Sequence, residues 1–103
     1  MILKPCEGFE IKLEDFNVHT FNCHVNIDKD FRGKIAVNAC KILIDGIFKT
    51  TDKTKLVAFI PKSQRHIRLF VSQLGFKKEG CLTKFSAEHK EDTLILSLNK
   101  GDE

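Results

Sequence analysis

The chain has 103 residues, of which 42% are hydrophobic and 30% are charged, and its formal net charge is +3. This length allows one domain with a single modest core, and no apolar run approaches the roughly 20 residues that a membrane-spanning helix needs. The mild positive charge does not by itself indicate a nucleic-acid-binding protein.

Four cysteines are spread along the chain without a C-x-x-C pair, a pattern that argues against a zinc ribbon and a thioredoxin-type motif. The first residues also lack the basic start and apolar stretch of a secretory signal peptide, so we expect a cytoplasmic protein without a metal site. In the cytoplasm thiols stay reduced, and we expect most of these to be buried. They are Cys6, Cys23, Cys40 and Cys81.

Alternating apolar and polar residues predict two antiparallel strands near the start of the chain, over residues 9–14 and 18–27. Residues 14–17 are then the predicted hairpin turn, and a short strand over residues 1–3 is expected to precede the pair. The polar side chains of the second strand, including His24, share a face that is either solvated or lines a cleft. Its apolar face carries Phe21, Cys23, Val25 and Ile27.

A helix is predicted to begin near Gly33, because polar residues recur from there at steps of three and four while nearly all residues between them are apolar. With so narrow a polar stripe, we expect the helix to be covered on most of its circumference, by the sheet and by something else. The polar positions are Lys34, Asn38, Lys41, Asp45 and Lys49.

Residues 56–60 are apolar without interruption, which favours a central strand that lies parallel to the earlier one and is reached by a right-handed crossover. A second helix is predicted over residues 64–74, with Ser63 as its N-cap and Gly75 at its C-terminal end. Two further strands are expected after it. Their ranges are residues 76–85 and 93–98.

The expected order of elements, β-β-β-α-β-α-β-β, resembles the C-terminal two-thirds of the GNAT superfamily of acyl-CoA N-acyltransferases. Residues 28–48 resemble the turn and helix that bind the cofactor pyrophosphate in that family, and residues 56–82 resemble its next strand and helix, which end in GF-x-x-EG. The resemblance implies an α/β (α+β) fold with a mixed, mostly antiparallel sheet, a central parallel βαβ crossover and two helices. The motif residues are Gly75, Phe76, Glu79 and Gly80.

The pattern is closest to small GNAT-like proteins of the kind often encoded by phages, which would place the chain in a host cytoplasm or a virion. An active member would use acetyl-CoA, held by backbone N–H groups at the start of the first helix, with His24 as a candidate general base. The residues implied in cofactor binding are Arg32, Gly33, Lys34, Ile35, Ala36, Val37 and Gln64.

Three features depart from the family pattern. Ile35 and Val37 stand where the family has glycine or alanine, and their side chains are expected to crowd the phosphates. Val71 stands where the family often has a tyrosine that protonates the leaving thiolate, and the chain contains no tyrosine. The strand and two helices that begin a full-length GNAT domain are also not expected, which leaves a sheet edge or face uncovered.

The histidines have a simpler interpretation as surface or hydrogen-bonded residues, which applies to His19, His66 and His89 and competes with catalysis for His24. A catalytic pair of Cys23 and His24 is disfavoured, because neighbours in a strand point to opposite faces.

Basic residues around the crossover form either a solvated surface or a patch that attracts an anion. No aromatic residues interleave them, so nucleic-acid binding is not expected. Arg32 and Lys34 oppose the dipole at a helix start, and a bound anion would explain them. The other basic residues are Lys49, Lys53, Lys55, Lys62, Arg65 and Arg68.

Two function classes remain open. One is an acetyl-CoA-dependent N-acetyltransferase in which residues 32–37 hold the pyrophosphate and His24 is the base. The other, which the three departures favour, is a reduced GNAT-like module that has lost turnover and serves as a binding or assembly protein. We expect such a module to use the uncovered sheet edge or face to bind a protein partner or a second copy, and not to bind a membrane.

Overall fold

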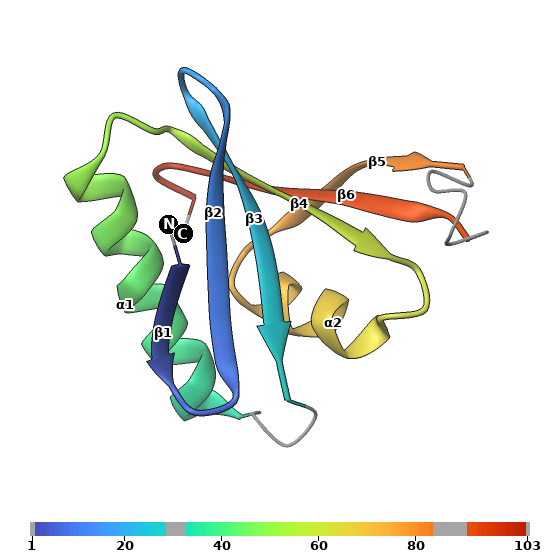
Figure 1. Cartoon of the computed structure of the whole chain (residues 1–103), viewed down its shortest axis with the longest axis horizontal. Helices are drawn as coiled ribbons and strands as arrows, with labels where there is room; N and C mark the ends of the chain where they lie inside the picture. Colours follow the sequence, from blue (N-terminus) through green and yellow to red (C-terminus); the bar gives the residue numbers. More distant parts are fainter. Residues whose placement is uncertain (1, 29–32, 84–90, 103) are drawn as a thin grey trace.

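The computed structural model describes residues 2–28, 33–83 and 91–102, in which six strands and two helices follow each other in the order that the sequence predicts (Figure 1). The elements are β1 (Ile2–Cys6), β2 (Phe9–Asn17), β3 (Thr20–Ile27), α1 (Lys34–Thr50), β4 (Lys55–Pro61), α2 (Arg65–Gln73), β5 (Lys77–Leu82) and β6 (Thr93–Asn99).

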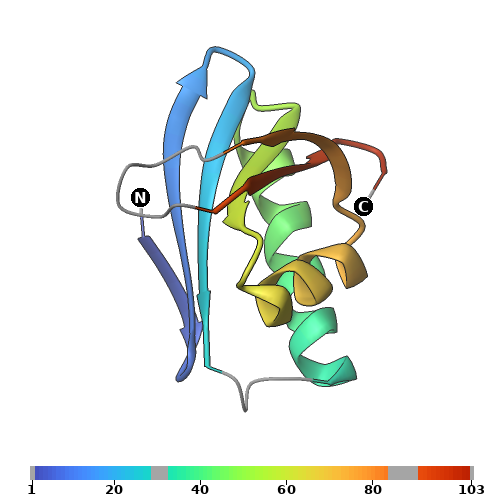
Figure 2. The same ribbon diagram turned by 90° about the vertical axis from the view of Figure 1, so that its right-hand side faces the viewer.

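The strands form one sheet in the order β1-β2-β3-β4-β6-β5. β3 and β4 pair in parallel, and the other neighbours pair antiparallel. Both helices lie on the same face of the sheet (Figure 2). The predicted mixed, mostly antiparallel α+β fold with a central parallel crossover is therefore confirmed, and the apolar run over residues 56–60 is the central strand β4.

The core lies between this face of the sheet and the two helices. α2 contributes Phe70, whose ring lies 5.8 Å from that of Phe9 on β2. β6 contributes its leucines to the core. α1 presents to the sheet one side on which every third or fourth residue is apolar. Its buried residues are Ala36, Cys40, Ile44, Ile47 and Phe48.

The opposite side of α1 remains exposed, although it is partly apolar. Ile35 is 87% exposed and Ile42 is 75% exposed, and Ala39 lies between them on the same side of the helix. No described part of the chain covers this stripe. The expectation that α1 is covered on most of its circumference is therefore not met within the described residues.

The sheet has two halves that are joined by few residues. β3 and β4 pair at three positions, from Thr20 opposite Lys55 to Asn22 opposite Val57. Beyond these positions β3 continues to pair with β2 and β4 continues to pair with β6, while β3 and β4 move apart (Figure 1). The parallel pair is thus closed at one end and open at the other.

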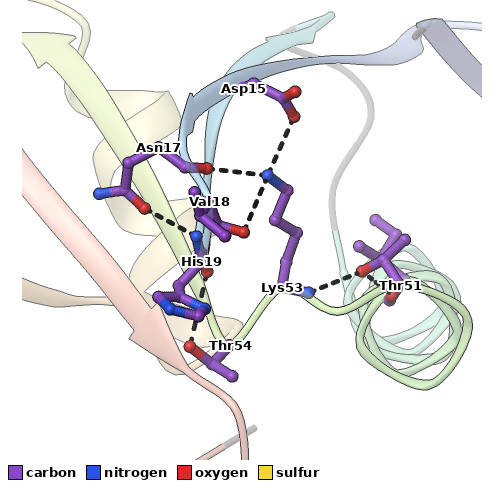
Figure 3. Close-up of polar contacts among 8 residues, drawn as sticks. Asp15, Asn17, Val18, His19, Thr51, Lys53 and Thr54 are labelled. Carbon is purple, nitrogen blue, oxygen red and sulfur yellow. Dashed lines mark hydrogen bonds and ion pairs between the residues drawn. The ribbon is translucent and has the colours of Figure 1, made fainter.

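The closed end is held by Lys53, in the loop between α1 and β4 (Figure 3). Its ammonium donates hydrogen bonds to the backbone oxygens of Asn17 at 2.8 Å and Val18 at 3.3 Å, and forms an ion pair with Asp15 at 3.1 Å. It also lies 4.9 Å from the centroid of the Phe21 ring. Only 12% of the Lys53 side chain is exposed, so this lysine connects the loop to the β2–β3 hairpin from a largely buried position.

The hairpin turn lies further along the chain than the sequence predicts. β2 extends to Asn17, so residues 14–17 are strand, and the turn consists of Val18 and His19. The strand pairing shifts register between Asp15 and Asn17, and the Asn17 side-chain oxygen accepts the His19 backbone N–H at 2.9 Å. An asparagine that binds the backbone two residues ahead favours a turn at that point.

The predicted cap of α2 is also wrong. α2 begins at Arg65 with Gln64 in the N-cap position, and no side-chain cap bond is present. The Ser63 hydroxyl instead donates to the Glu91 carboxylate at 2.8 Å, a partner 28 positions away. At the other end Gly75 has a positive φ of 105°, which is the conformation expected of a residue that ends a helix.

Replacing Lys53 by methionine is expected to lower the free energy of unfolding by about 2 kcal/mol, because two carbonyl oxygens and Asp15 lose a charged donor while the length of the side chain is kept. Urea denaturation followed by circular dichroism measures the change. Lys100→Met, at an exposed position, is the matched control and should leave the midpoint unchanged. Equal stability of the Lys53 variant and the wild type would contradict the role given to this lysine.

Candidate functional site

A groove of about 800 Å³ runs between α1 and α2 at the end of β3. Its apolar lining comes from all three elements, and one of these residues, Leu69, is 54% exposed although it is a leucine. Leu69 lies on α2 away from the core residues Ile67 and Val71. The apolar residues of the lining are Ile27, Val37, Leu69 and Phe70.

Three cations line the same groove. Lys34 and Lys41 lie about two turns apart on one side of α1, and Arg65 faces them from the start of α2. Asp28 is the only acidic residue among the described lining residues. None of the three cations forms an ion pair with a carboxylate in the part of the chain that the structure describes. The groove therefore combines apolar walls with a positively charged rim.

The first turn of α1 adds to this positive end. Gly33 occupies the N-cap position with φ at 99°, and α1 has no acidic residue in its first turn and no side-chain cap bond. The first N–H groups of a helix have no partner within it, and the helix dipole disfavours a cation such as Lys34 there. A Cβ placed on Gly33 would meet no atom within 4 Å, so the described chain leaves space beside this backbone.

The structure brings together only part of the predicted cofactor site. Gly33, Lys34 and Val37 line the groove. Ile35 points to solvent and is not part of the lining, and Ala36 is buried in the core. Residues of one helix turn point in different directions, so the run of neighbours in the sequence is divided among the groove, the solvent and the core.

Another predicted residue, Gln64, lies outside the groove lining. Gln64 is exposed at the N-cap position of α2. Arg32 lies outside the described residues. Lys41 and Leu69 were not predicted as site residues, although Lys41 stands two helical turns after Lys34 and Leu69 interrupts the polar side of α2. Those two sequence signals become informative only once α1 and α2 are placed side by side.

His24 lies on β3, just beyond the last pair with β4, and its side chain is exposed. The residues of β3 alternate between the two faces of the sheet, and the buried Cys23 and Phe21 mark the face that carries the helices. His24 therefore faces the opposite side of the sheet from α1 and α2. A histidine at this position is accessible from the open end of the β3–β4 pair.

The position of the expected tyrosine and the described cysteines do not line the groove. Val71 is fully buried in the core, at 0% exposure. Cys23 is 5% exposed, and burial raises the pKa of its thiol to about 12, so this thiol stays protonated at physiological pH. Cys81 is exposed on the edge strand β5, and Cys40 is buried on the side of α1 that faces the core.

Three residues of the predicted basic patch form contacts within the chain. Lys53 is part of the hairpin contact, Lys49 pairs with Asp45 at 2.8 Å, and Lys55 pairs with Glu79. The hydrogen bond from Lys55, together with one from Ser97, holds the pKa of the Glu79 carboxyl below its usual value. Because these carboxylates neutralise part of the positive charge, the patch attracts the phosphates of a nucleic acid less strongly.

The groove residues fit a phosphorylated ligand such as coenzyme A. Lys34, Lys41 and Arg65 would supply positive charge to phosphates, and the start of α1 would supply backbone N–H groups. Ile35 does not line the groove, so of the two branched side chains in the turn only Val37 narrows it. The described residues contain no group of three histidine, cysteine or acidic side chains that could hold a metal ion.

A family model described as a protein of unknown function, DUF2824, matches residues 7–101. A search among curated proteins finds no match. Within the described residues, no helix is long and apolar enough to span a membrane.

Several solved structures share the fold. Ribosomal-protein-S5-alanine acetyltransferase from Vibrio fischeri is 23% identical with a TM-score of 0.69, over 91% of this chain and 54% of that one. A GNAT-family acetyltransferase from Bacillus anthracis is 17% identical with a TM-score of 0.75, over 88% and 57%. Microcin C7 self-immunity acetyltransferase, in complex with acetyl-CoA and AMP, is 21% identical with a TM-score of 0.72, over 89% and 54%. The chain thus spans little more than half the length of these proteins.

Iodoacetamide at pH 8.5 is expected to alkylate Cys81 well before Cys23, because the thiolate is the reactive form and burial raises the pKa of Cys23 to about 12. Mass spectrometry of tryptic peptides at successive times measures both rates. The same reaction in urea serves as the control, since unfolding should make the alkylation rates of the two cysteines equal. Modification of Cys23 in the folded protein as fast as Cys81 would contradict its burial.

Proposed function

The chain belongs to the family of proteins of unknown function DUF2824 and has the GNAT acetyltransferase fold, and we propose that it is a binding or assembly module that has lost acetyl transfer. The proposal agrees with the resemblance to small GNAT-like proteins that phages encode. A module of that kind would act in the cytoplasm of a host or in a virion.

One observation carries the proposal. Acetyl transfer from a thioester needs a proton for the leaving thiolate, and a positioned side chain usually supplies it. The position where the resemblance implies a tyrosine is Val71, which is fully buried and has no exchangeable proton. The chain contains no tyrosine that a different alignment could bring to this position, and the buried thiol of Cys23 lies in the core.

Binding is supported by surface that the described chain leaves uncovered. Ile35 and Ile42 are large apolar side chains exposed on α1, and Leu69 is exposed on α2. Contiguous exposed apolar surface on a folded domain marks a site of interaction. The face of the sheet opposite the helices carries no described helix (Figure 2). A protein partner or a second copy of the chain would cover one of these surfaces.

An active acetyl-CoA-dependent N-acetyltransferase is the second candidate function. The solved structure of the microcin C7 self-immunity acetyltransferase with acetyl-CoA favours it at the level of the shared fold. Acetyl-CoA, when bound, supplies an acetyl group activated as a thioester. Lys34, Lys41 and Arg65 would hold its phosphates, and His24, exposed at the open end of the β3–β4 pair, would take a proton from an amine acceptor.

A spectrophotometric assay for thiol release is expected to show no acetyl transfer above the uncatalysed rate. Acetyl-CoA is the donor, and the acceptor is spermidine or a peptide with an N-terminal alanine. The physical reason is that Val71, at the position of the expected tyrosine, has no proton to give to the thiolate. Spermidine N-acetyltransferase, run in parallel with spermidine, is the positive control for the assay.

Turnover that His24→Gln abolishes would overturn the proposal and establish the enzyme instead. Turnover that survives His24→Gln would also overturn it, and would move the general base to another residue or to water. Calorimetry with acetyl-CoA then separates binding from chemistry, because a module can retain the groove and still lack turnover.

A further inference from the structure

We infer that the groove between α1 and α2 receives an amphipathic segment of a protein partner in which acidic residues flank apolar ones. The inference rests on the proposed function, since it names the partner of the same groove.

The walls of the groove suit apolar side chains. Leu69 stands at 54% exposure on one wall, and Val37 and Phe70 contribute to the floor. A volume of about 800 Å³ is near the upper end of the range for small-molecule pockets, roughly 300–1,000 Å³, and is open along two helices. An apolar groove between two helices is a surface that a helix-in-groove partner can use.

The charge of the rim selects the flanking residues of the partner. Lys34 and Lys41 lie on the α1 side of the groove and Arg65 lies on the α2 side. Asp28 is the single carboxylate in the described lining. A partner with lysine or arginine at its flanks would face like charges, whereas glutamate or aspartate would pair with them. A second copy would bring the same cations to the interface, so the rim disfavours self-association through this groove.

The surface beyond the rim distinguishes a protein from a small molecule. Ile35 and Ile42 lie on α1 outside the groove and are 87% and 75% exposed. A phosphorylated cofactor held by the three cations would leave both isoleucines in water. A protein whose segment occupies the groove would extend over α1 and cover them.

The test uses the full chain and a fluorescein-labelled peptide of about 18 residues with leucines on one face and glutamates on the other, which as a helix is about 27 Å long, close to the length of the 17-residue α1. Fluorescence anisotropy measures its Kd. A second peptide has lysine in place of every glutamate. The glutamate peptide is expected to bind at least about tenfold more tightly than the lysine peptide, with an affinity that falls as salt is raised.

Two substitutions locate the binding. Leu69→Glu is expected to weaken the binding of the glutamate peptide by about tenfold or more, since it places a carboxylate on an apolar wall. Lys41→Glu is expected to weaken the binding of this peptide by several fold and to make the affinity less dependent on salt. Lys100→Glu, far from the groove, is the matched control and should change nothing. Leu69 and Lys41 are exposed, and circular dichroism confirms that both variants are folded.

Several results would overturn the inference. These are no binding of the glutamate peptide, equal binding of both peptides, or binding that Leu69→Glu leaves unchanged. A dimer in light scattering that Leu69→Glu dissociates would assign the groove to a second copy. Coenzyme A binding without peptide binding would assign it to a cofactor. None of these outcomes decides whether acetyl transfer is lost, which the thiol-release assay measures separately.

Discussion

The three residue pairs between β3 and β4 are the constraint on which the rest of the structure depends. They join β1-β2-β3 to β4-β6-β5, and the buried ammonium of Lys53 fixes the adjacent hairpin to the loop that leads into β4. Because the pair is closed at this end, the strands separate toward the other, and α2 lies near β3 on the helical face. The groove between α1 and α2 is thus a consequence of how the sheet is joined.

Much of this fold could be predicted from hydrophobic periodicity. The apolar run of β4 and the stripe of α1 identify the crossover, because burial on both faces of a strand and on one side of a helix leaves distinct patterns. The turn at Val18 and His19 and the start of α2 could not be placed in the same way. The first depends on a hydrogen bond from the His19 backbone N–H to the Asn17 side chain and on a register shift, and the second on Glu91, which is distant in sequence.

The candidate site was less predictable than the fold. The sequence identified the start of α1, where Gly33, Lys34 and Val37 line the groove, but grouped them with Ile35 and Ala36, which point elsewhere. A motif read along the chain carries no information on which side of a helix each residue takes after packing. The convergence of Lys41, Arg65 and Leu69 follows from the placement of two helices, which no local pattern encodes.

The sparse junction also bears on the order in which the chain folds. The β2–β3 hairpin needs only a two-residue turn, whereas Thr20 and Lys55 pair across a loop that contains the whole of α1. Closing the longer loop costs more conformational entropy for only three residue pairs, so the parallel contact is expected to form after the hairpin. Until then one edge of β3 is open to other chains. The late step in folding and the open end of the native sheet therefore share one cause.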